Sequence, residues 1–249
     1  MFIHQGKRRT ATHNLQIASL LSFVAGLVNV AGFLAVAKLT TNVTGHFAFF
    51  VDEVFKLDLW QGLVYFLYIL SFFLGSFCSS FLVETISRKN ANYVYMVPTG
   101  IESFILFLIA VLGASAYLQN ADVIACSLLF AMGLQNSLVT RISNAVVRTT
   151  HLTGLFTDLG IELSQLFFYR EPESKKTLFA SIRLRLTIIS FFFIGGTVGG
   201  IFYSKMGLYV LLIGSVTLIL GIVYDHLKLK VKLIHRRYRR PKRATFGTP

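Results

Sequence analysis

Charged residues are scarce in this sequence, and proline and cysteine are scarcer still. Of its 249 residues, 14% are Asp, Glu, Lys or Arg, whereas 54% are hydrophobic and the mean hydropathy is +0.65. Soluble globular chains carry about 25% charged residues, so this composition excludes a soluble domain. The two cysteines, Cys78 and Cys126, exclude a disulfide framework and a thiolate metal site. The sequence has only four prolines but 24 phenylalanines, and this composition excludes a disordered or collagen-like chain.

The hydrophobic residues are collected into long runs. A helix needs about 20 apolar residues to cross the hydrocarbon core of a bilayer, because lipid cannot hydrogen-bond a bare backbone. Six runs qualify: Leu15–Ala37, Leu59–Val83, Tyr93–Ala121, Val123–Thr140, Leu186–Ser204 and Met206–Tyr224. The sequence therefore predicts an all-α membrane protein with six transmembrane helices.

The basic residues are distributed unevenly between these runs. Lys and Arg number 24 against 11 acidic residues, which gives a formal net charge of +13. If the N-terminus is cytoplasmic, only Lys38, Lys56 and Lys205 lie on the outer side of the membrane, and the other basic residues lie on its cytoplasmic side. Cytoplasmic loops are enriched in Lys and Arg, so both termini are expected in the cytoplasm.

This topology divides the chain into a polar lead (1–14), one transmembrane domain (15–225) and a basic tail (226–249). The tail has no carboxylate after Asp225. We expect it to contact anionic lipid headgroups, with each basic residue near the surface contributing on the order of 1 kcal/mol. Nucleic-acid binding is not expected, because the tail follows a membrane span directly and lacks the aromatic platforms of single-strand binders.

Three short patterns occur twice, in the same order along the chain. They are F-x-x-G-L-x-N at Phe23–Asn29 and Phe130–Asn136, T-T-[NH]-[VL]-T-G at Thr40–Gly45 and Thr149–Gly154, and small-residue clusters at Gly75–Ser80 and Gly195–Gly200. Repetition in order indicates a duplicated unit. We expect two repeats of three helices, at about 15–117 and 121–225. Because each repeat has an odd number of crossings, the second would be inverted relative to the first.

The T-T-x-x-T-G segments are expected to interrupt the helical structure. Clustered threonines and a glycine form helices poorly, and each segment precedes a stretch too short or too charged to span the membrane, His46–Lys56 and Leu155–Tyr169. We interpret each segment as an extended or re-entrant element that leads into a half-helix. The alternative is a pair of ordinary solvated loops.

We expect the two T-T-x-x-T-G segments to meet near the middle of the protein and to form one solute site. In an inverted repeat, equivalent elements approach the same axis from opposite faces. The predicted substrate-binding residues are Asn29, Thr41, Asn42, Thr44, Gly45, Gln135, Asn136, Thr150, His151, Thr153 and Gly154. Half-helix N-termini near the two motif glycines would favour a small anionic or zwitterionic solute. For the amides within helices, helix packing is the alternative.

Two acidic residues are candidates for coupling transport to an ion gradient. Glu102 lies well inside a predicted span, four residues after Pro98, where a proline kink would free backbone carbonyls. It is expected either to carry a coupling proton or to lie near the interface, paired with Arg or Lys. Asp158 stands four residues before Glu162, and these two acids are expected either to pair with Arg148 or to face water.

Small residues spaced four apart recur in the second and fifth predicted helices, at Gly75 and Ser79 and at Gly195 and Gly199. Such residues allow close packing of helices in membranes. We expect these two helices to cross one another near the axis that relates the repeats.

No catalytic or cofactor motif is present. G-x-S-x-G, H-E-x-x-H and G-x-x-x-x-G-K-[ST] are all absent. His46 and His151 are not spaced as metal ligands, and they are expected to be either proton-responsive groups or hydrogen-bonded loop residues. We therefore expect no enzyme, cofactor or metal. Three functions remain: a secondary transporter or permease for a small solute, a non-transporting membrane scaffold or lipid-binding protein, and a small membrane enzyme acting on lipid.

The second T-T-x-x-T-G motif and its surroundings resemble a known family. Val147–Gly154, which continues to Thr157–Gly160 and follows Gly133–Asn136, is similar to the signature of the YoaK-like family of bacterial integral membrane proteins. The first motif is similar too, although the family more often has His and Asn at the positions of Asn42 and His46. The resemblance covers nearly the whole chain. It implies a multi-pass protein of the bacterial inner membrane, and it names neither a substrate nor a catalytic residue.

The charge bias predicts which loops a membrane-impermeant thiol reagent reaches in intact cells. With the native cysteines replaced, a cysteine at Gln119 or Lys205 should be labelled from outside, whereas one at Lys89 or Lys175 should not. Labelling at position 89 from outside would contradict the six-span topology.

Overall fold

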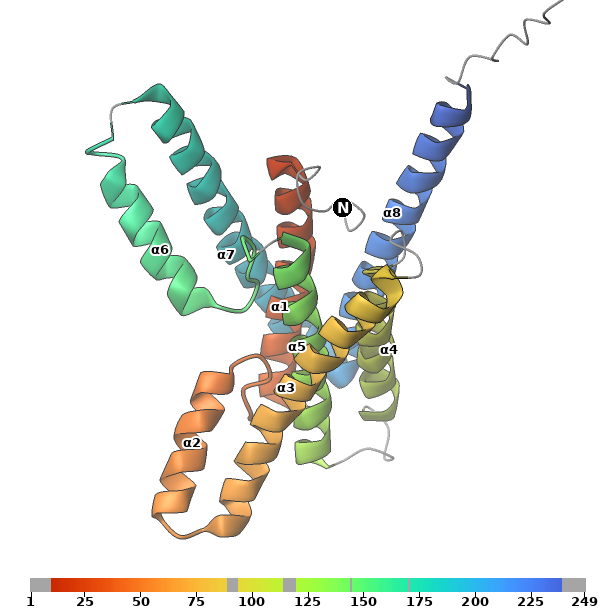
Figure 1. Cartoon of the computed structure of the whole chain (residues 1–249). Coiled ribbons are helices and arrows are strands. Elements are labelled where there is room, and N and C mark those ends of the chain that lie inside the picture. Colours follow the sequence, from red (N-terminus) through yellow and green to blue (C-terminus); the bar gives the residue numbers. More distant parts are fainter. Residues whose placement is uncertain (1–9, 89–93, 114–119, 144, 170, 239–249) are drawn as a thin grey trace, which may run out of the picture.

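The computed structural model describes residues 10–88, 94–113, 120–143, 145–169 and 171–238, and its regular elements in this part of the chain are all helices. In chain order they are α1 (Ala11–Val36), α2 (Val43–Phe55), α3 (Leu59–Ser87), α4 (Met96–Gly113), α5 (Ala121–Ser143), α6 (Leu152–Gln165), α7 (Pro172–Met206), the 3-10 helix η2 (Gly207–Val210) and α8 (Leu211–Tyr238). Figure 1 shows a hairpin of α2 and α3 at one end and a hairpin of α6 and α7 at the other. The predicted all-α class is confirmed.

Five helical segments of the described chain are long and apolar enough to cross a membrane, where the sequence predicted six. They are Thr12–Val36, Leu59–Ser87, Met96–Gly113, Ala121–Ser143 and Pro172–Lys228. The last segment contains the fifth and sixth predicted runs, on α7 and α8. At their junction Gly207 has φ +58, a conformation that glycine adopts without strain, and Figure 1 shows α7 and α8 diverging from this point.

Helix α4 is shorter than the run that predicted it, and its proline lies at its start. Of the predicted run Tyr93–Ala121, residues 93 and 114–119 lie outside the described part of the chain. Pro98 is the third residue of α4, where a backbone amide has no partner within the helix to lose. The predicted kink beside Glu102 is therefore wrong, and Glu102 lies in the second turn of an uninterrupted helix.

Each T-T-x-x-T-G motif forms a short turn followed directly by a helix. Helices α2 and α6 begin at Val43 and Leu152, so the motif glycines lie in a first helical turn rather than at a break. Only the two threonines and the next residue of each motif are non-helical. The half-helices therefore begin three residues before their predicted starts at His46 and Leu155.

Helices α1 and α7 cross with their backbones in contact. A methyl group added at Gly26 of α1 would lie 2.0 Å from the carbonyl oxygen of Phe192 on α7. In return, a methyl group at Gly195 of α7 would lie 2.0 Å from the carbonyl oxygen of Phe23 on α1. Neither position can hold a larger side chain unless the helices separate.

Helices α5 and α3 cross in the same way. A methyl group at Gly133 of α5 would lie 2.1 Å from the carbonyl oxygen of Phe72, and one at Gly75 of α3 would lie 2.1 Å from that of Phe130. Ser76 adds a hydrogen bond of 3.1 Å to the carbonyl oxygen of Gly133. The glycines and Phe130 of this crossing occupy the same positions of the repeated patterns as the glycines and Phe23 of the α1–α7 crossing, and Phe72 and Phe192 each stand three residues before the pattern glycine.

The prediction that the two small-residue helices pack on each other is wrong. Gly75 of α3 packs on α5, and Gly195 of α7 packs on α1. The reason is that the F-x-x-G-L-x-N helices also present a glycine at the crossing. Each small-residue helix therefore reaches closest approach on an F-x-x-G-L-x-N helix, where both partners lack a side chain.

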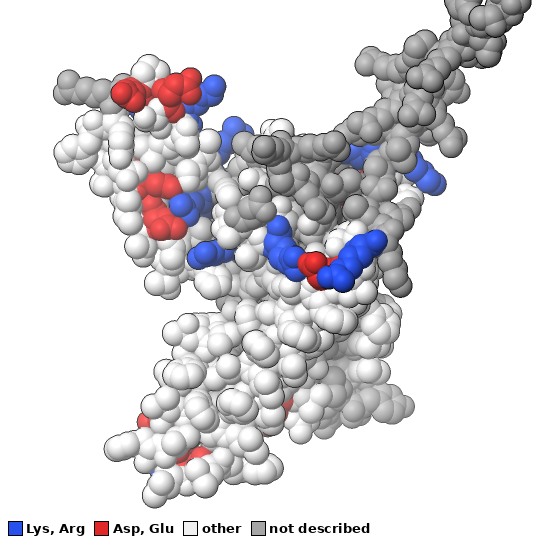
Figure 2. Space-filling view, in the orientation of Figure 1, with Lys and Arg blue, Asp and Glu red and all other residues white. Residues whose placement is uncertain are grey.

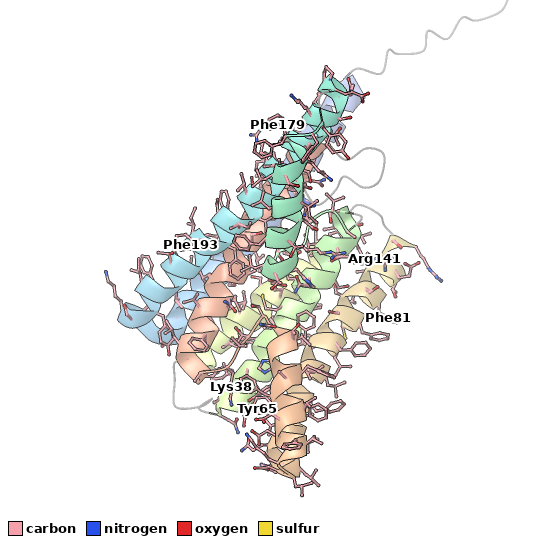
Figure 3. All side chains as sticks on the ribbon, turned by 90° about the vertical axis from the view of Figure 1, so that its left-hand side faces the viewer. Lys38, Tyr65, Phe81, Arg141, Phe179 and Phe193 are labelled. Carbon is pink, nitrogen blue, oxygen red and sulfur yellow. The ribbon has the colours of Figure 1, made fainter. Side chains whose placement is uncertain are left out.

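The outer surface of the bundle is largely apolar and aromatic. Figure 3 shows Phe81, Phe179 and Phe193 on this surface, and each is more than half exposed. Among the candidate spans, α1 and α5 are the most deeply buried. Apolar side chains turned outward and polar ones turned inward suit a hydrocarbon environment rather than water.

Helix α8 continues through the predicted start of the basic tail at residue 226 and ends at Tyr238. The first part of the tail is therefore an extension of the last helix. Residues 1–9 and 239–249 lie outside the described residues, and so do the lipid contacts predicted for the basic residues among them.

Replacing a crossing glycine by alanine should destabilise the protein. Gly26→Ala and Gly133→Ala each drive a methyl group into a carbonyl oxygen of the partner helix, and overpacking costs about 1–3 kcal/mol. We expect both variants to show a lower midpoint of thermal unfolding in detergent. Gly160→Ala in α6 is the matched control, because its methyl group meets nothing within 4 Å and alanine favours the helix. An unchanged midpoint of thermal unfolding for Gly26→Ala would contradict the close approach of the two backbones at this crossing.

Candidate functional site

The two T-T-x-x-T-G turns lie against a common cavity of about 330 Å³. Its lining residues are Asn29, Leu39, Thr41, Asn42, Val43, Thr44, Phe72, Thr150, His151, Leu152, Thr153, Gly154 and Phe192. Figure 2 shows the surface hollowed between the α2–α3 hairpin and the α6–α7 hairpin. Of the predicted solute-site residues, Gly45, Gln135 and Asn136 are not part of this lining, and the structure brings the others together.

Each turn is anchored to a long helix through an asparagine. Thr41 donates a hydrogen bond of 2.7 Å to the side-chain oxygen of Asn29 on α1. Asn136 on α5 donates one of 2.8 Å to the hydroxyl of Thr150, which lies 3.0 Å from the amide oxygen of the same Asn136. These two pairs occupy equivalent positions of the repeat. These bonds hold the first turn against α1 and the second turn against α5.

The first threonine of each motif is buried behind the cavity. Thr40 donates a hydrogen bond of 3.1 Å to the carbonyl oxygen of Val28. Thr149 accepts one of 3.2 Å from Gln135, which also donates one of 3.0 Å to the carbonyl oxygen of Leu21. Gln135 thus connects α5 to α1 and to the second turn, as the helix-packing alternative predicted for it.

Helices α2 and α6 both begin at the cavity, but only α2 is capped by a side chain. Asn42 accepts a hydrogen bond of 3.1 Å from the backbone amide of Gly45. His151 occupies the equivalent position before α6 and makes no capping hydrogen bond. A helix N-terminus carries partial positive charge, and its first amides can bind an anion. The two sides of the cavity therefore differ, because a side-chain cap occupies an amide of the first turn of α2 but none of α6.

The two histidines have different surroundings. Burial lowers the pKa of His151, and the nearby charge of Arg148 lowers it further. The residue lines the cavity. His46 is buried, contacts the ring of Tyr65 and hydrogen-bonds to the carbonyl oxygen of Leu39. Burial also lowers the pKa of His46. No group of three or more His, Cys, Asp and Glu side chains within the described residues could hold a metal ion.

A second cavity, of about 380 Å³, lies beside the start of α6 and shares His151 and Gly154 with the first. Arg148, Asp158 and Arg185 line it. The first turn of α6 therefore contributes to the walls of both cavities.

Ion pairs hold α6 to α7. Arg185 on α7 donates a hydrogen bond of 2.9 Å to Asp158 and bonds of 2.8 Å to both carboxylate oxygens of Glu162. The predicted pairing with Arg148 is therefore wrong, because Arg185 on the neighbouring helix reaches both acids. Burial alone would raise the pKa of Glu162, but hydrogen bonds from Arg185 and Ser181 outweigh burial and hold this pKa below its usual value.

Glu102 lies apart from the lining of both cavities. It has no exposed surface, and neither of its carboxylate oxygens has a hydrogen-bond partner among the described residues. The alternative of an interfacial carboxyl group paired with Arg or Lys is therefore wrong. The proton-coupling alternative stays a prediction.

The sequence interpretation missed two aromatic residues of the lining and one polar contact. Phe72 and Phe192 occupy equivalent positions of the repeat, at the same offset as Gly75 and Gly195, so the repeat itself carried a signal for them. Tyr68 on α3 donates a hydrogen bond to Asp122 at the start of α5. No sequence pattern joins these two residues, because only the α3–α5 crossing brings them together.

Comparison with known proteins supplies a family. Residues 17–224 match the family described as "Protein of unknown function (DUF1275)". The "UPF0700 transmembrane protein YoaK" of Bacillus subtilis (strain 168) is 22% identical over 196 residues, which cover 76% of this chain and 83% of that protein. No solved structure matches the chain. The resemblance inferred from the motifs is confirmed, and the apolar helices agree with a multi-pass membrane protein.

The Asn136–Thr150 pair should contribute measurably to stability. Interhelical hydrogen bonds in membranes are worth about 0.6–2 kcal/mol. In a double-mutant cycle of Asn136→Ala and Thr150→Val, we expect a coupling energy in this range, measured from unfolding in detergent. Asn136→Ala with Thr157→Val is the control cycle, because Thr157 bonds only to its own helix at the carbonyl of Thr153. Equal additivity in both cycles would contradict the anchoring role.

Proposed function

This chain belongs to the DUF1275 family of proteins of unknown function, and we propose that it is a secondary transporter or permease for a small solute bound in the 330 Å³ cavity. The observation that carries the proposal is that both copies of a repeated polar turn line one cavity. Transporters built from inverted repeats bind their substrates at the interface of the repeats, beside interrupted helices. Such a role requires no catalytic group.

The packing supports an inverted repeat in which α1, α2 and α3 correspond to α5, α6 and α7. The α1–α7 and α5–α3 crossings use equivalent glycines and equivalent carbonyl groups. The Asn29–Thr41 and Asn136–Thr150 pairs are equivalent as well. An axis that exchanges α1 with α5 and α3 with α7 would pass between the crossings, where both turns meet the cavity.

We count α7 and α8 as two separate crossings, which gives six in all. The segment Pro172–Lys228 has 57 residues, and at about 1.5 Å per residue it is far longer than a bilayer core of about 30 Å. The change of direction at Gly207 supports this count. An odd number of crossings in each repeat then follows, as inversion requires.

The cavity favours an anionic or zwitterionic solute. The N-terminus of α6 opens onto it without a side-chain cap, and Arg148 lies in the adjoining cavity. The hydroxyl groups of Thr44 and Thr153 and the amide group of Asn42 add neutral hydrogen-bonding groups. An anionic end would bind at the α6 side, and the remainder of the solute would contact Phe72 and Phe192.

We propose that α6 is the more mobile of the two half-helices. Helix α2 is held to α3 by aromatic contacts such as Phe49 with Tyr65 and Phe50 with Phe66. Helix α6 is held to α7 mainly by Arg185 and a small apolar cluster of Leu159, Leu178 and Ile182. Because α6 contributes to both cavities, its movement would join or separate them, as a gate does.

We place both termini on the cytoplasmic side of a bacterial inner membrane. On the face shown in Figure 2, Lys and Arg atoms lie toward the α6–α7 end, and the α2–α3 end carries almost none. This distribution agrees with enrichment of basic residues on the cytoplasmic side. The cavity beside α6 would then open toward the cytoplasm.

Removing hydroxyl groups from the cavity should impair transport without unfolding the protein. Purified protein is screened for thermal stabilisation by small carboxylates, amino acids and inorganic phosphate, and each stabilising solute is tested for uptake into proteoliposomes. Thr44→Val and Thr153→Val preserve side-chain volume. We expect Thr153→Val, at the α6 side, to weaken uptake about tenfold, as for a lost hydrogen bond to a charged group, and Thr44→Val to weaken it less, as for a lost bond to a neutral group.

Thr197→Val is the control, because Thr197 is exposed on α7 and bonds to its own helix at the carbonyl of Phe193. It should leave uptake unchanged. If no stabilising solute enters proteoliposomes faster than protein-free vesicles, the transporter proposal fails. Binding or turnover of lipid by the same preparation would then favour a lipid-binding protein or a lipid-modifying enzyme.

A further inference from the structure

We infer that Glu102 is a proton-binding site, that its side chain is a neutral carboxylic acid in this conformation, and that its proton drives transport. The driving role rests on the proposed transport function, whereas the protonation does not. Asp158, the other predicted coupling residue, is paired with Arg185 at 2.9 Å and takes part in holding α6. We therefore assign coupling to Glu102 alone.

Glu102 lies on the face of α4 that packs into the bundle. Thr99, three residues before Glu102, and Leu106, four residues after it, are buried on the same side of the helix. The next residue, Ser103, is buried as well. Glu102 has no exposed surface, and both of its oxygens lack a hydrogen-bond partner among the described residues. The carboxyl group is thus shielded from water and from lipid headgroups.

The hydroxyl groups nearest to Glu102 along α4 are bonded to other partners. Thr99 donates a hydrogen bond of 2.9 Å to the carbonyl oxygen of Tyr95. Ser103 exchanges hydrogen bonds of 2.9 and 3.0 Å with Ser215 on α8. A carboxylate only accepts hydrogen bonds, and these groups have no free proton to donate to it. A carboxylate in this position would have no hydrogen-bond donor to stabilise its negative charge, whereas a neutral carboxylic acid carries no charge that needs one.

No described cation pairs with Glu102. Helices α3, α5, α8 and η2 pack against α4. The ionisable residues with described side chains in these helices and at the C-cap of α3 are Tyr65, Tyr68, Cys78, Glu84, Arg88, Asp122, Cys126, Arg141, Tyr209, Tyr224, Asp225, His226, Lys228 and Lys230. Arg88 and Arg141 pair with Glu84, and Lys228 lies over the ring of Tyr224. Asp122 accepts a hydrogen bond from Tyr68, and Asp225 and His226 have interactions of their own.

An ionised carboxyl group without donors or a counter-ion is strongly disfavoured in a low-dielectric interior, and such a group binds a proton instead. The proton can leave only when water reaches Glu102. Because Glu102 has no exposed surface, this requires α4 to move relative to the helices that pack against it. Proton release is thus linked to a change in helix packing, which is the condition for coupling a proton to transport.

Infrared spectroscopy of the purified protein tests the protonation directly. In a detergent without ester groups, the wild type at neutral pH should show the C=O stretching band of a protonated carboxylic acid. Glu102→Gln should lose this band, and Glu84→Gln should keep it, because Glu84 is an exposed, ion-paired carboxylate. Glu102→Asp keeps a carboxyl group and should shift the band, which preserves the test if the Gln variant does not fold. A wild-type spectrum without the band would overturn the proposal.

Uptake into proteoliposomes tests the coupling. A pH gradient should accelerate uptake by the wild type and by Glu84→Gln, and should have no effect on Glu102→Gln. Gradient-dependent uptake by Glu102→Gln would overturn the driving role. If the wild type shows the infrared band but transports no tested solute, the transport function fails while the proton-binding site stands.

Discussion

The structure depends on the direct contact of backbones at two helix crossings. Lipid provides no hydrophobic force between helices, so their association depends on close packing and on hydrogen bonds. Gly26 with Gly195 and Gly133 with Gly75 allow this packing. The carbonyl groups that face Gly26 and Gly133 belong to Phe192 and Phe72, which also line the cavity. The contacts that hold the bundle together therefore also fix two walls of the candidate site.

The polar turns are fixed to this framework by side chains rather than by their own backbone. Asn29 and Asn136 each hold a threonine of the adjacent turn, and the half-helix that follows each turn then starts at the cavity. The two halves differ in what holds these helices further out. Aromatic packing secures α2, whereas ion pairs and a small apolar cluster secure α6, so the two equivalent helices are held by different kinds of contact.

Composition and periodicity were sufficient to predict the helical class and the long apolar segments, whereas six crossings and an inverted repeat stay proposals. The motif threonines were predicted as site residues because hydroxyls that recur in two halves are not required by ordinary loops. The pairing of the helices could not be predicted, because the sequence does not show which helix a glycine such as Gly26 or Gly75 packs on. The pairing of Arg185 with Asp158 and Glu162 depends on the return of α7 alongside α6. The lack of any partner for Glu102 is likewise a property of the assembled bundle.

The two crossings also join the halves of the chain in an interleaved way. Helix α1 of the first half packs on α7 of the second half, and α3 of the first half packs on α5 of the second. During synthesis, α1 must wait in the bilayer until nearly the whole chain has been made before its glycine finds a partner, so neither half is an autonomous folding unit. The same interleaving means that the rigid bodies of any rocking motion are mixed pairs, α1 with α7 and α3 with α5, rather than the two sequence repeats.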